Sequence, residues 1–274
     1  MLELRELVEQ TRQQALVRKN SRGGRSAAEH MVAALRCLYR FAEDDGHVPP
    51  SGNPGLRLKK PRRLPSPRTA LSSQHLAQIA AAVSNSGPDP VLDILIIRLH
   101  LETACRVGSA LALRPCDLDP THCLVRLFGK NGTIHWQPIS PTLMQALMDH
   151  RARGADENPE SPLLRRSTGR RITRRYYDRL WQRVSKQVPW VEIQQVSTHW
   201  LRHTTLTWVE RSFGYAVARA FAAHAAPSGI SGTTLLYSKA TLEEVATALS
   251  FMTGEPHPLA STRETPQTRQ PRAF

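Results

Sequence analysis

His199 and Arg202 stand three residues apart in the run THWLRHT at 198–204. Residues with this spacing share one face of a helix, so the imidazole and the guanidinium would lie side by side. Both groups bind phosphate: arginine presents a planar fork of donors, and histidine donates a hydrogen bond or carries a proton. The pair therefore predicts a site for a phosphate group.

Two further reactive side chains follow this pair, His224 and Tyr237. A tyrosine phenol can act as a covalent nucleophile where its neighbours stabilise the phenolate. Basic groups and a tyrosine that converge on phosphate indicate DNA strand cutting without a metal. Each signal alone is also typical of an ordinary packing or surface residue, so the interpretation depends on matches upstream.

An arginine at a helix break is the first upstream match. An apolar helical run at 91–101 breaks near Thr103 and resumes as a short helix that ends before Pro115, because proline is a helix stop signal. Arg106 lies at the break, beside small residues, where its side chain could project into a cleft. The alternative is a solvated arginine at a helix start.

A lysine in a predicted turn is the second match. Lys130 lies in the sequence GKNG at 129–132, between β-rich runs at 123–128 and 133–139. Asn-Gly between such runs is the strongest short-range signal for a β-hairpin. Lys130 is therefore expected at a hairpin tip, where a lysine is usually solvated.

Taken together, the chemistry-bearing residues resemble the signature of the tyrosine recombinases, the phage integrase family, in order and approximate spacing: Arg106, Lys130, His199, Arg202, His224 and Tyr237. The likeness extends over about residues 26–253, and the combination is specific although each part is not. It implies a site-specific DNA recombinase that cuts and rejoins strands through a 3′-phosphotyrosyl intermediate.

The resemblance also implies a role for each of these residues. Tyr237 attacks the scissile phosphate, and Arg106 and Arg202 hold its non-bridging oxygens. Lys130 protonates the departing 5′ oxygen. His199 assists proton transfer at the tyrosine, and His224 hydrogen-bonds the phosphate. No metal, ATP or other cofactor is required, because the phosphotyrosine linkage preserves the bond energy for religation.

Several positions depart from the family pattern. Ala104-Cys105 replaces the usual glycine before the first arginine, and Ser109 stands where many members carry glutamate. Trp200 replaces an acidic residue. The segment 224–237 is a few residues longer than is typical, which affects the expected loop geometry more than the identity of the nucleophile.

The composition indicates a polyanionic partner. The 274 residues include 37 Lys+Arg against 23 Asp+Glu, a formal net charge of +14, and such proteins bind nucleic acid in a salt-dependent way. Ribosomal and membrane-surface proteins share this balance. The sequence has neither an 18-residue apolar run nor a signal-type N-terminus, so we expect neither a membrane span nor a signal peptide, and no membrane partner. The resemblance to DNA recombinases implies a cytoplasmic location at the bacterial nucleoid. The four cysteines lack a CxxC pair, which favours reduced thiols and no metal site.

The predicted fold is mainly α with a small β-hairpin or sheet, an α+β arrangement in two lobes. Residues 1–56 form a small helical core-binding lobe, shorter than is usual in the family, and 57–68 a basic, proline-rich linker. Residues 69–254 form the catalytic domain, and 255–274 a disordered tail. In the first lobe, one helix is expected to bury a stripe of four side chains: Met31, Leu35, Leu38 and Phe41.

Double-stranded DNA is the expected partner. The residues expected to touch it are basic: Lys59, Lys60, Arg62 and Arg63 in the linker, and Arg174 and Arg175 in a cluster that starts at Arg165. The alternative for each is a solvated surface. Monomers are expected to form a homotetramer on two DNA sites, with an accessory protein that sets the direction. A capped amphipathic helix at 241–252 docks either on its own domain or, as our hypothesis, on a neighbouring subunit.

Two other functions fit part of this pattern. A type IB topoisomerase uses a similar set of residues to relax DNA, and a DNA-binding regulator could keep the fold without the chemistry. The helical lobe, the basic linker and the terminal helix favour recombination over relaxation, and the complete residue set argues against a regulator.

Overall fold

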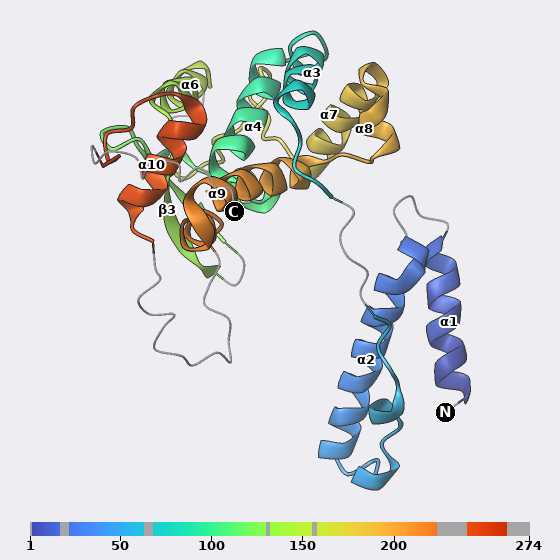
Figure 1. Cartoon of the computed structure of the whole chain (residues 1–274). Helices are drawn as coiled ribbons and strands as arrows, with labels where there is room; N and C mark the ends of the chain where they lie inside the picture. The colour runs from blue at the N-terminus through green and yellow to red at the C-terminus, as the bar shows by residue number, and fades with distance from the viewer. Residues whose placement is uncertain are drawn as a thin grey trace, which may run out of the picture. The chain divides into compact units, whose positions relative to one another are not determined.

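The computed structural model divides the chain into two compact units, Met1–Pro67 and Arg68–Phe274. It describes residues 2–16, 22–62, 68–129, 132–154, 158–223 and 240–261. Each unit is described by itself below, and Figure 1 labels their elements. Within the described residues, no helix combines the length and the apolarity needed to cross a membrane.

The first unit is built on two helices, α1 (Leu2–Leu16) and α2 (Arg25–Asp44), which lie side by side (Figure 1). Short 3₁₀ turns occupy Arg22–Gly24, Pro50–Gly52 and Pro54–Arg57. Gly24 makes the entry to α2 possible, because it adopts a φ of 67° and a Cβ there would lie 2.1 Å from the Arg12 carbonyl oxygen.

The burial of side chains on α2 differs from the prediction. Val32 and Leu35 are buried together with Leu58, but Leu38 and Phe41 are 61% and 54% exposed. The predicted stripe is therefore only half covered, because the described elements of the unit pack on the side of the helix that carries Val32 and Leu35.

The second unit is mainly helical and carries a small sheet, which confirms the predicted fold class. Its helices are α3 (Ser73–Ser84), α4 (Pro90–Thr103), α5 (Val107–Ala112), α6 (Pro141–Arg153), α7 (Arg174–Gln187), α8 (Pro189–Ile193), α9 (Thr198–Phe221) and α10 (Leu242–Thr253), with a 3₁₀ turn at Pro115–Asp117. The antiparallel sheet has the order β1-β2-β3, from β1 (Leu118–Asp119), β2 (Leu124–Phe128) and β3 (Ile134–Pro138). The hairpin β2–β3 was predicted and the short strand β1 was not.

Side-chain caps fix where these helices begin. The Ser72 hydroxyl accepts from the His75 N–H at the start of α3, and Asp89 and Ser140 cap α4 and α6 in the same way. Thr241 and Glu244 form the predicted capping box at α10. Each cap satisfies N–H groups that have no partner inside the helix, which stabilises the helix by about 1 kcal/mol.

Helix α4 lies at the centre of the unit and packs against α3, α6 and α9. Ile96 and Leu99 on this helix are fully buried. The buried carboxylate of Asp93 forms an ion pair with Arg183 and accepts a 2.7 Å hydrogen bond from Tyr176 Oη. Tyr176 and the neighbouring Tyr177 are both buried, so both are packing residues of α7.

Helix α9 changes direction at Gly214, whose φ of 86° and ψ of 171° are open essentially to glycine alone. Beyond it, Phe221 packs against Val245 and Leu249 of α10. Figure 1 shows α10 beside α9 and β3. The apolar face of α10 is thus buried on its own chain, which corrects our hypothesis that this face docks on a neighbouring subunit.

The segment after α10 also differs from the prediction. Residues 255–261 were expected to belong to a disordered tail, but the Glu255 carboxylate accepts a hydrogen bond from the Thr142 N–H at 3.1 Å. His257 is buried, and its Nε2 lies 3.2 Å from the Cys123 carbonyl oxygen. These contacts fasten the segment to α6 and to the start of β2. The rest of the predicted tail, 262–274, lies outside the described residues.

Candidate active site

Three of the predicted catalytic residues can be placed in the second unit: Arg106, His199 and Arg202. Lys130, His224 and Tyr237 lie outside the described residues. The site is therefore built here from the two arginines, the histidine and the elements that hold them.

Arg106 lies between α4 and α5, at the break predicted from the sequence. Ala104 ends α4 with a φ of 50°, a left-handed conformation, and its N–H donates to the His100 carbonyl oxygen. Left-handed backbone costs an alanine about 1 kcal/mol, so this is a position where the family's usual glycine would be unstrained. Arg106 follows as the N-cap of α5, and its side chain is exposed.

Arg202, by contrast, is buried, with 7% of its surface exposed. Its Nη1 donates to the Ala104 carbonyl oxygen, and its Nη2 donates to the Ala222 carbonyl oxygen at 3.0 Å. The first bond ties Arg202 to the turn that carries Arg106. The second reaches the end of α9 and is possible because the helix changes direction at Gly214.

A buried hydrogen-bonded chain supports the same turn from the other side. His100 Nδ1 lies 3.1 Å from the Cys105 carbonyl oxygen, and His100 Nε2 lies 3.0 Å from Tyr177 Oη. A carbonyl oxygen only accepts, so Nδ1 carries the proton and Nε2 accepts from Tyr177. Complete burial lowers the pKa of His100 to about 4, which keeps the ring neutral. The peptide directly before Arg106 is thereby fixed.

Positive charge gathers around this turn. Burial and then the charge of Arg106 lower the pKa of Arg202 to about 10, so Arg202 stays protonated at neutral pH. Burial, followed by the charges of Arg68 and Arg202, lowers the pKa of His199 below its ordinary value of 6.5. Burial and the two arginines act on His135 in the same direction. We call these five residues the basic cluster: Arg68, Arg106, His135, His199 and Arg202.

Two members of the basic cluster were missed as site residues. Arg68 was counted only as part of the linker, yet it belongs to the second unit and its charge acts on His199. His135 lies on β3 opposite Leu127, a buried residue of β2. Successive side chains of a strand point to opposite faces. This alternation, applied to the predicted hairpin, could have placed His135 on the inner face.

Ser109 connects α5 with the hairpin. Its Oγ donates a 2.5 Å hydrogen bond to the Phe128 carbonyl oxygen at the end of β2, two residues before Lys130. The serine that replaces the family's usual glutamate thus ties the helix after Arg106 to the strand that leads to Lys130.

The predicted DNA-contacting residues fall into both units. Lys59, Lys60 and Arg62 are exposed in the first unit, and Arg63 lies outside the described residues. Arg174 and Arg175 are exposed at the start of α7.

Arg174 comes close to the start of α5. A Cβ placed at Gly108 would lie 3.9 Å from Arg174 Nη2. The guanidinium of Arg174 thus lies beside the helix that Arg106 begins.

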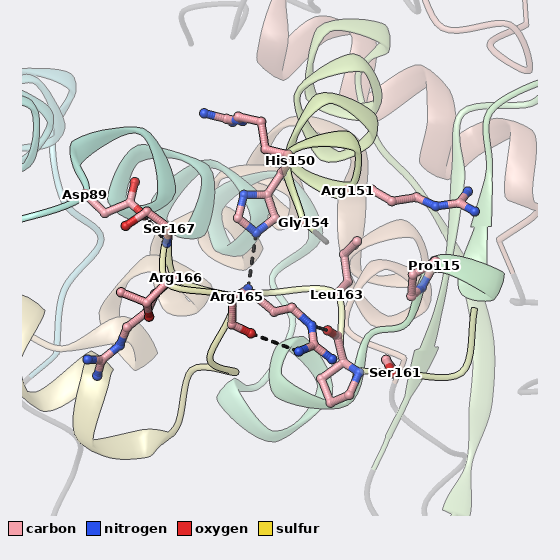
Figure 2. A pocket seen from close by; sticks show the side chains of 14 residues that line it. Asp89, Pro115, His150, Arg151, Gly154, Ser161, Leu163, Arg165, Arg166 and Ser167 are labelled. Atoms are coloured by element: carbon pink, nitrogen blue, oxygen red, sulfur yellow. Dashed lines mark hydrogen bonds between the residues drawn. The ribbon is translucent and has the colours of Figure 1, made fainter. Parts of the chain in front are cut away.

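Arg165 and Arg166, from the same basic stretch, make contacts that stabilise the fold. Arg165 Nε donates to the Pro162 carbonyl oxygen at 3.0 Å, and its Nη1 donates to the Gly169 carbonyl oxygen at 2.9 Å. Arg166 lies over the ring of Tyr176. Figure 2 shows Arg165 and Arg166 beside a pocket of about 440 Å³ at the end of α6. Arg106, His199 and Arg202, the predicted catalytic residues that the structure describes, do not line this pocket.

The basic cluster is suited to binding an anion. Two guanidinium groups and neutral imidazoles supply donors for phosphate oxygens, and a buried arginine stabilises negative charge more strongly than an exposed one. Among the described residues, no group of three or more His, Cys, Asp or Glu side chains is placed to hold a metal ion.

Comparisons with known proteins agree with this chemistry. Residues 69–232, more than half of the chain, match the sequence profile of the phage integrase family. The tyrosine recombinase XerC of Roseiflexus sp. strain RS-1 is 28% identical over 189 residues, which cover 65% of this chain and 58% of that protein. The chain thus spans less than two thirds of the length of this relative.

Solved structures share the fold. A lambda integrase dimer bound to a COC′ core site superposes with a TM-score of 0.59 at 16% identity, over 76% of this chain and 75% of that one. A lambda integrase tetramer bound to a Holliday junction superposes with a TM-score of 0.60 at 14% identity, over 78% of this chain and 62% of that one.

Proposed function

Because the chain belongs to the phage integrase family, we propose that it is a site-specific recombinase that cuts and rejoins double-stranded DNA through a 3′-phosphotyrosyl intermediate. The basic cluster carries this proposal. Within it, exposed Arg106 and buried Arg202 are held close together by hydrogen bonds that Arg202 and His100 make to one turn. Like charges that lie close together repel each other, and an anion bound between them offsets this repulsion.

Strand cutting is then one in-line displacement at phosphorus. The Tyr237 oxygen forms a bond to phosphorus while the bond from phosphorus to the 5′ oxygen breaks. The tyrosine proton passes to His199, whose lowered pKa leaves the ring neutral and able to accept it. Lys130 donates a proton to the departing 5′ oxygen. Religation reverses these steps with a new 5′ hydroxyl group.

The arginines stabilise the charge that builds up during this displacement. Arg106 and Arg202 donate to the non-bridging oxygens of the phosphate, and the burial of Arg202 reduces the competition from water. His224 adds a hydrogen bond to the same phosphate. Loss of one such donor typically lowers a rate by about 100- to 1000-fold.

The proposed DNA contacts are the basic residues predicted from the sequence. Lys59, Lys60, Arg62 and Arg63 bind phosphates from the first unit, and Arg174 and Arg175 bind them from the start of α7. Binding of this kind weakens steeply with salt.

For the assembly, we propose a tetramer of monomers on two DNA sites at the bacterial nucleoid, with an accessory protein for direction. The tetrameric arrangement of lambda integrase on a Holliday junction supports this stoichiometry. Because the apolar face of α10 is buried on its own chain, contacts between subunits use other surfaces.

Covalent trapping tests the proposal. DNA that binds the full chain is first selected from a random library, and a nicked version of the selected site then traps the adduct in the presence of EDTA. We expect an adduct at Tyr237 that is lost in Tyr237→Phe, while DNA affinity stays nearly unchanged. Tyr215→Phe is the matched control, because Tyr215 is a 65% exposed tyrosine that is not part of the proposed catalytic set.

The outcomes separate the rival functions. An adduct that persists in Tyr237→Phe, or that maps to Tyr215, contradicts the assignment of the nucleophile. A requirement for magnesium contradicts the mechanism. Relaxation of supercoiled DNA without exchange between paired sites identifies a topoisomerase, and specific binding with no adduct identifies a regulator.

A second substrate tests Lys130 as the acid. Lys130→Ala should cut ordinary DNA slowly but recover on a 5′-bridging phosphorothiolate, because a thiolate leaves without needing a proton. Absence of recovery, with Arg106→Ala as the control that this substrate does not rescue, would remove Lys130 from that role.

A further inference from the structure

His135 lies in β3, on the face of the strand that points into the protein. Its neighbours along the strand, Ile134 and Trp136, are exposed, whereas His135 is paired with buried Leu127 across the hairpin. Because strand residues alternate between two faces, the imidazole points to the inner side of the sheet. The chain therefore places a titratable ring where apolar residues are the rule.

One nitrogen of the His135 ring makes no hydrogen bond within the described part of the chain. His135 Nδ1 is buried and has no hydrogen-bond partner among the described residues. A buried polar group without a partner costs about 1–3 kcal/mol, so native proteins rarely keep one unless a ligand, ion or water completes it. By contrast, both ring nitrogens of His100, a fully buried histidine near the site, are hydrogen-bonded.

The charges around His135 identify the chemistry of the missing partner. Arg202 and Arg106 are the charged groups that act on the ring, and with burial they lower its pKa. A neutral imidazole carries one donor nitrogen. A ligand that satisfies this donor and lies beside two guanidinium groups is an anion with oxygen acceptors.

We propose that His135 contacts the substrate directly, by donating a hydrogen bond from Nδ1 to a non-bridging oxygen of the phosphate that Arg106 and Arg202 hold. This inference rests on the proposed function, and it adds a residue to the catalytic set recognised in the sequence. The phosphate is then gripped from three elements: the turn before α5, helix α9 and strand β3.

Three variants test this contact. His135→Leu keeps a side chain of comparable size on the inner face and removes the donor. His135→Asn keeps an N–H donor near the position of Nδ1. The control is His122→Ala, because His122 lies in the turn between β1 and β2 and pairs with Asp119 at 2.8 Å.

Single-turnover cutting of a nicked site at saturating DNA is the first measurement. We expect a loss of about tenfold or more for His135→Leu, the usual effect of one lost hydrogen bond to a charged group. His135→Asn should recover much of the rate, and His122→Ala should match the unmodified protein. Unfolding temperatures of the three variants show whether the fold is kept.

Stereospecific substitution of the phosphate is the decisive measurement. A methylphosphonate at the cut site replaces one non-bridging oxygen with a methyl group, and its two diastereomers remove different oxygens. If His135 bonds one oxygen, the rate loss in His135→Leu disappears with one diastereomer and persists with the other. A structural defect lowers the rate equally with both.

The inference is overturned if both diastereomers show the full loss or if His135→Leu cuts at the unmodified rate. It is also overturned if His135→Asn and His135→Leu are equally slow while both remain folded. Failure of the proposed function looks different, because then the unmodified protein itself forms no adduct at Tyr237.

Discussion

Arg202 donates a hydrogen bond from Nη1 to the main-chain carbonyl oxygen of Ala104, two residues before Arg106. One arginine of the basic cluster thus holds the backbone that presents the other. Since Nη2 of the same group bonds the Ala222 carbonyl oxygen, Arg202 has a structural role in addition to any bond to phosphate.

Replacement of Arg202 by lysine keeps the positive charge but should disrupt the hydrogen bonds to the two carbonyl oxygens. A lysine ammonium cannot span two carbonyl oxygens in the fixed fork of a guanidinium. We expect Arg202→Lys to lower the cutting rate by about 100-fold or more and to lower the unfolding free energy by about 1–3 kcal/mol. Arg211→Lys, an exposed position on the same helix, is the control. Wild-type stability in Arg202→Lys would contradict the structural role.

Two adjacent tyrosines test whether the hydrogen-bonded chain through His100 positions Arg106. Tyr177 donates to His100, and Tyr176 donates to Asp93; both are buried. Tyr177→Phe and Tyr176→Phe should each destabilise the fold by about 1–3 kcal/mol, but only Tyr177→Phe should slow cutting at saturating DNA.

The effect of Tyr177→Phe on the rate should also vanish when Arg106→Ala is already present, because Tyr177 acts through that arginine. Equal rate losses for the two tyrosine variants, or an undiminished loss in the Arg106→Ala background, would show a general loss of packing instead.

Gly214 provides a backbone test. A Cβ at Gly214 meets nothing within 4 Å, so any effect of Gly214→Ala comes from its φ of 86° and ψ of 171°, a conformation that costs other residues about 1–3 kcal/mol. We expect lower stability and slower cutting, because the Ala222 carbonyl moves away from Arg202. Gly254→Ala, with a φ of 73° and equally open space, should lower stability alone. Similar cutting rates for the two variants would contradict the link.

Acid should destabilise the second unit through His100. Its folded pKa of about 4 lies below the ordinary value of 6.5, so the unfolded chain binds the proton more readily. The stabilisation is complete above about pH 6.5 and is lost as the pH falls through 4. The difference between the folded and the ordinary pKa corresponds to roughly 3 kcal/mol of unfolding free energy. Urea titrations between pH 7 and 4 measure it. His100→Asn should flatten the slope in this window, and an unchanged slope would exclude His100 as its source.

Local signals in the sequence predicted the parts of the site that depend on neighbours along the chain. The break before Arg106 follows from helix punctuation, and the hairpin follows from Asn131-Gly132 between β-rich runs. Each of these features arises within a few residues.

Features that join distant segments could not be read from the sequence. The bond from Arg202 to Ala104 spans 98 positions, and no local pattern marks a side chain that donates to a remote carbonyl. The docking of α10 on α9 was left open for the same reason, since an apolar face shows that burial occurs but not against what. His135 was missed because one polar residue on an inner strand face resembles an interruption of the apolar pattern.

The two bonds of Arg202 also have a thermodynamic consequence. Ala222 lies at the end of α9, two residues before His224, on the chain that leads to Tyr237. A shift of that carbonyl changes the hydrogen bonding of the guanidinium and hence its affinity for phosphate. Coupling free energies are reciprocal, so an anion bound at Arg202 biases the position of the Ala222 carbonyl, and with it the end of α9, by the same amount.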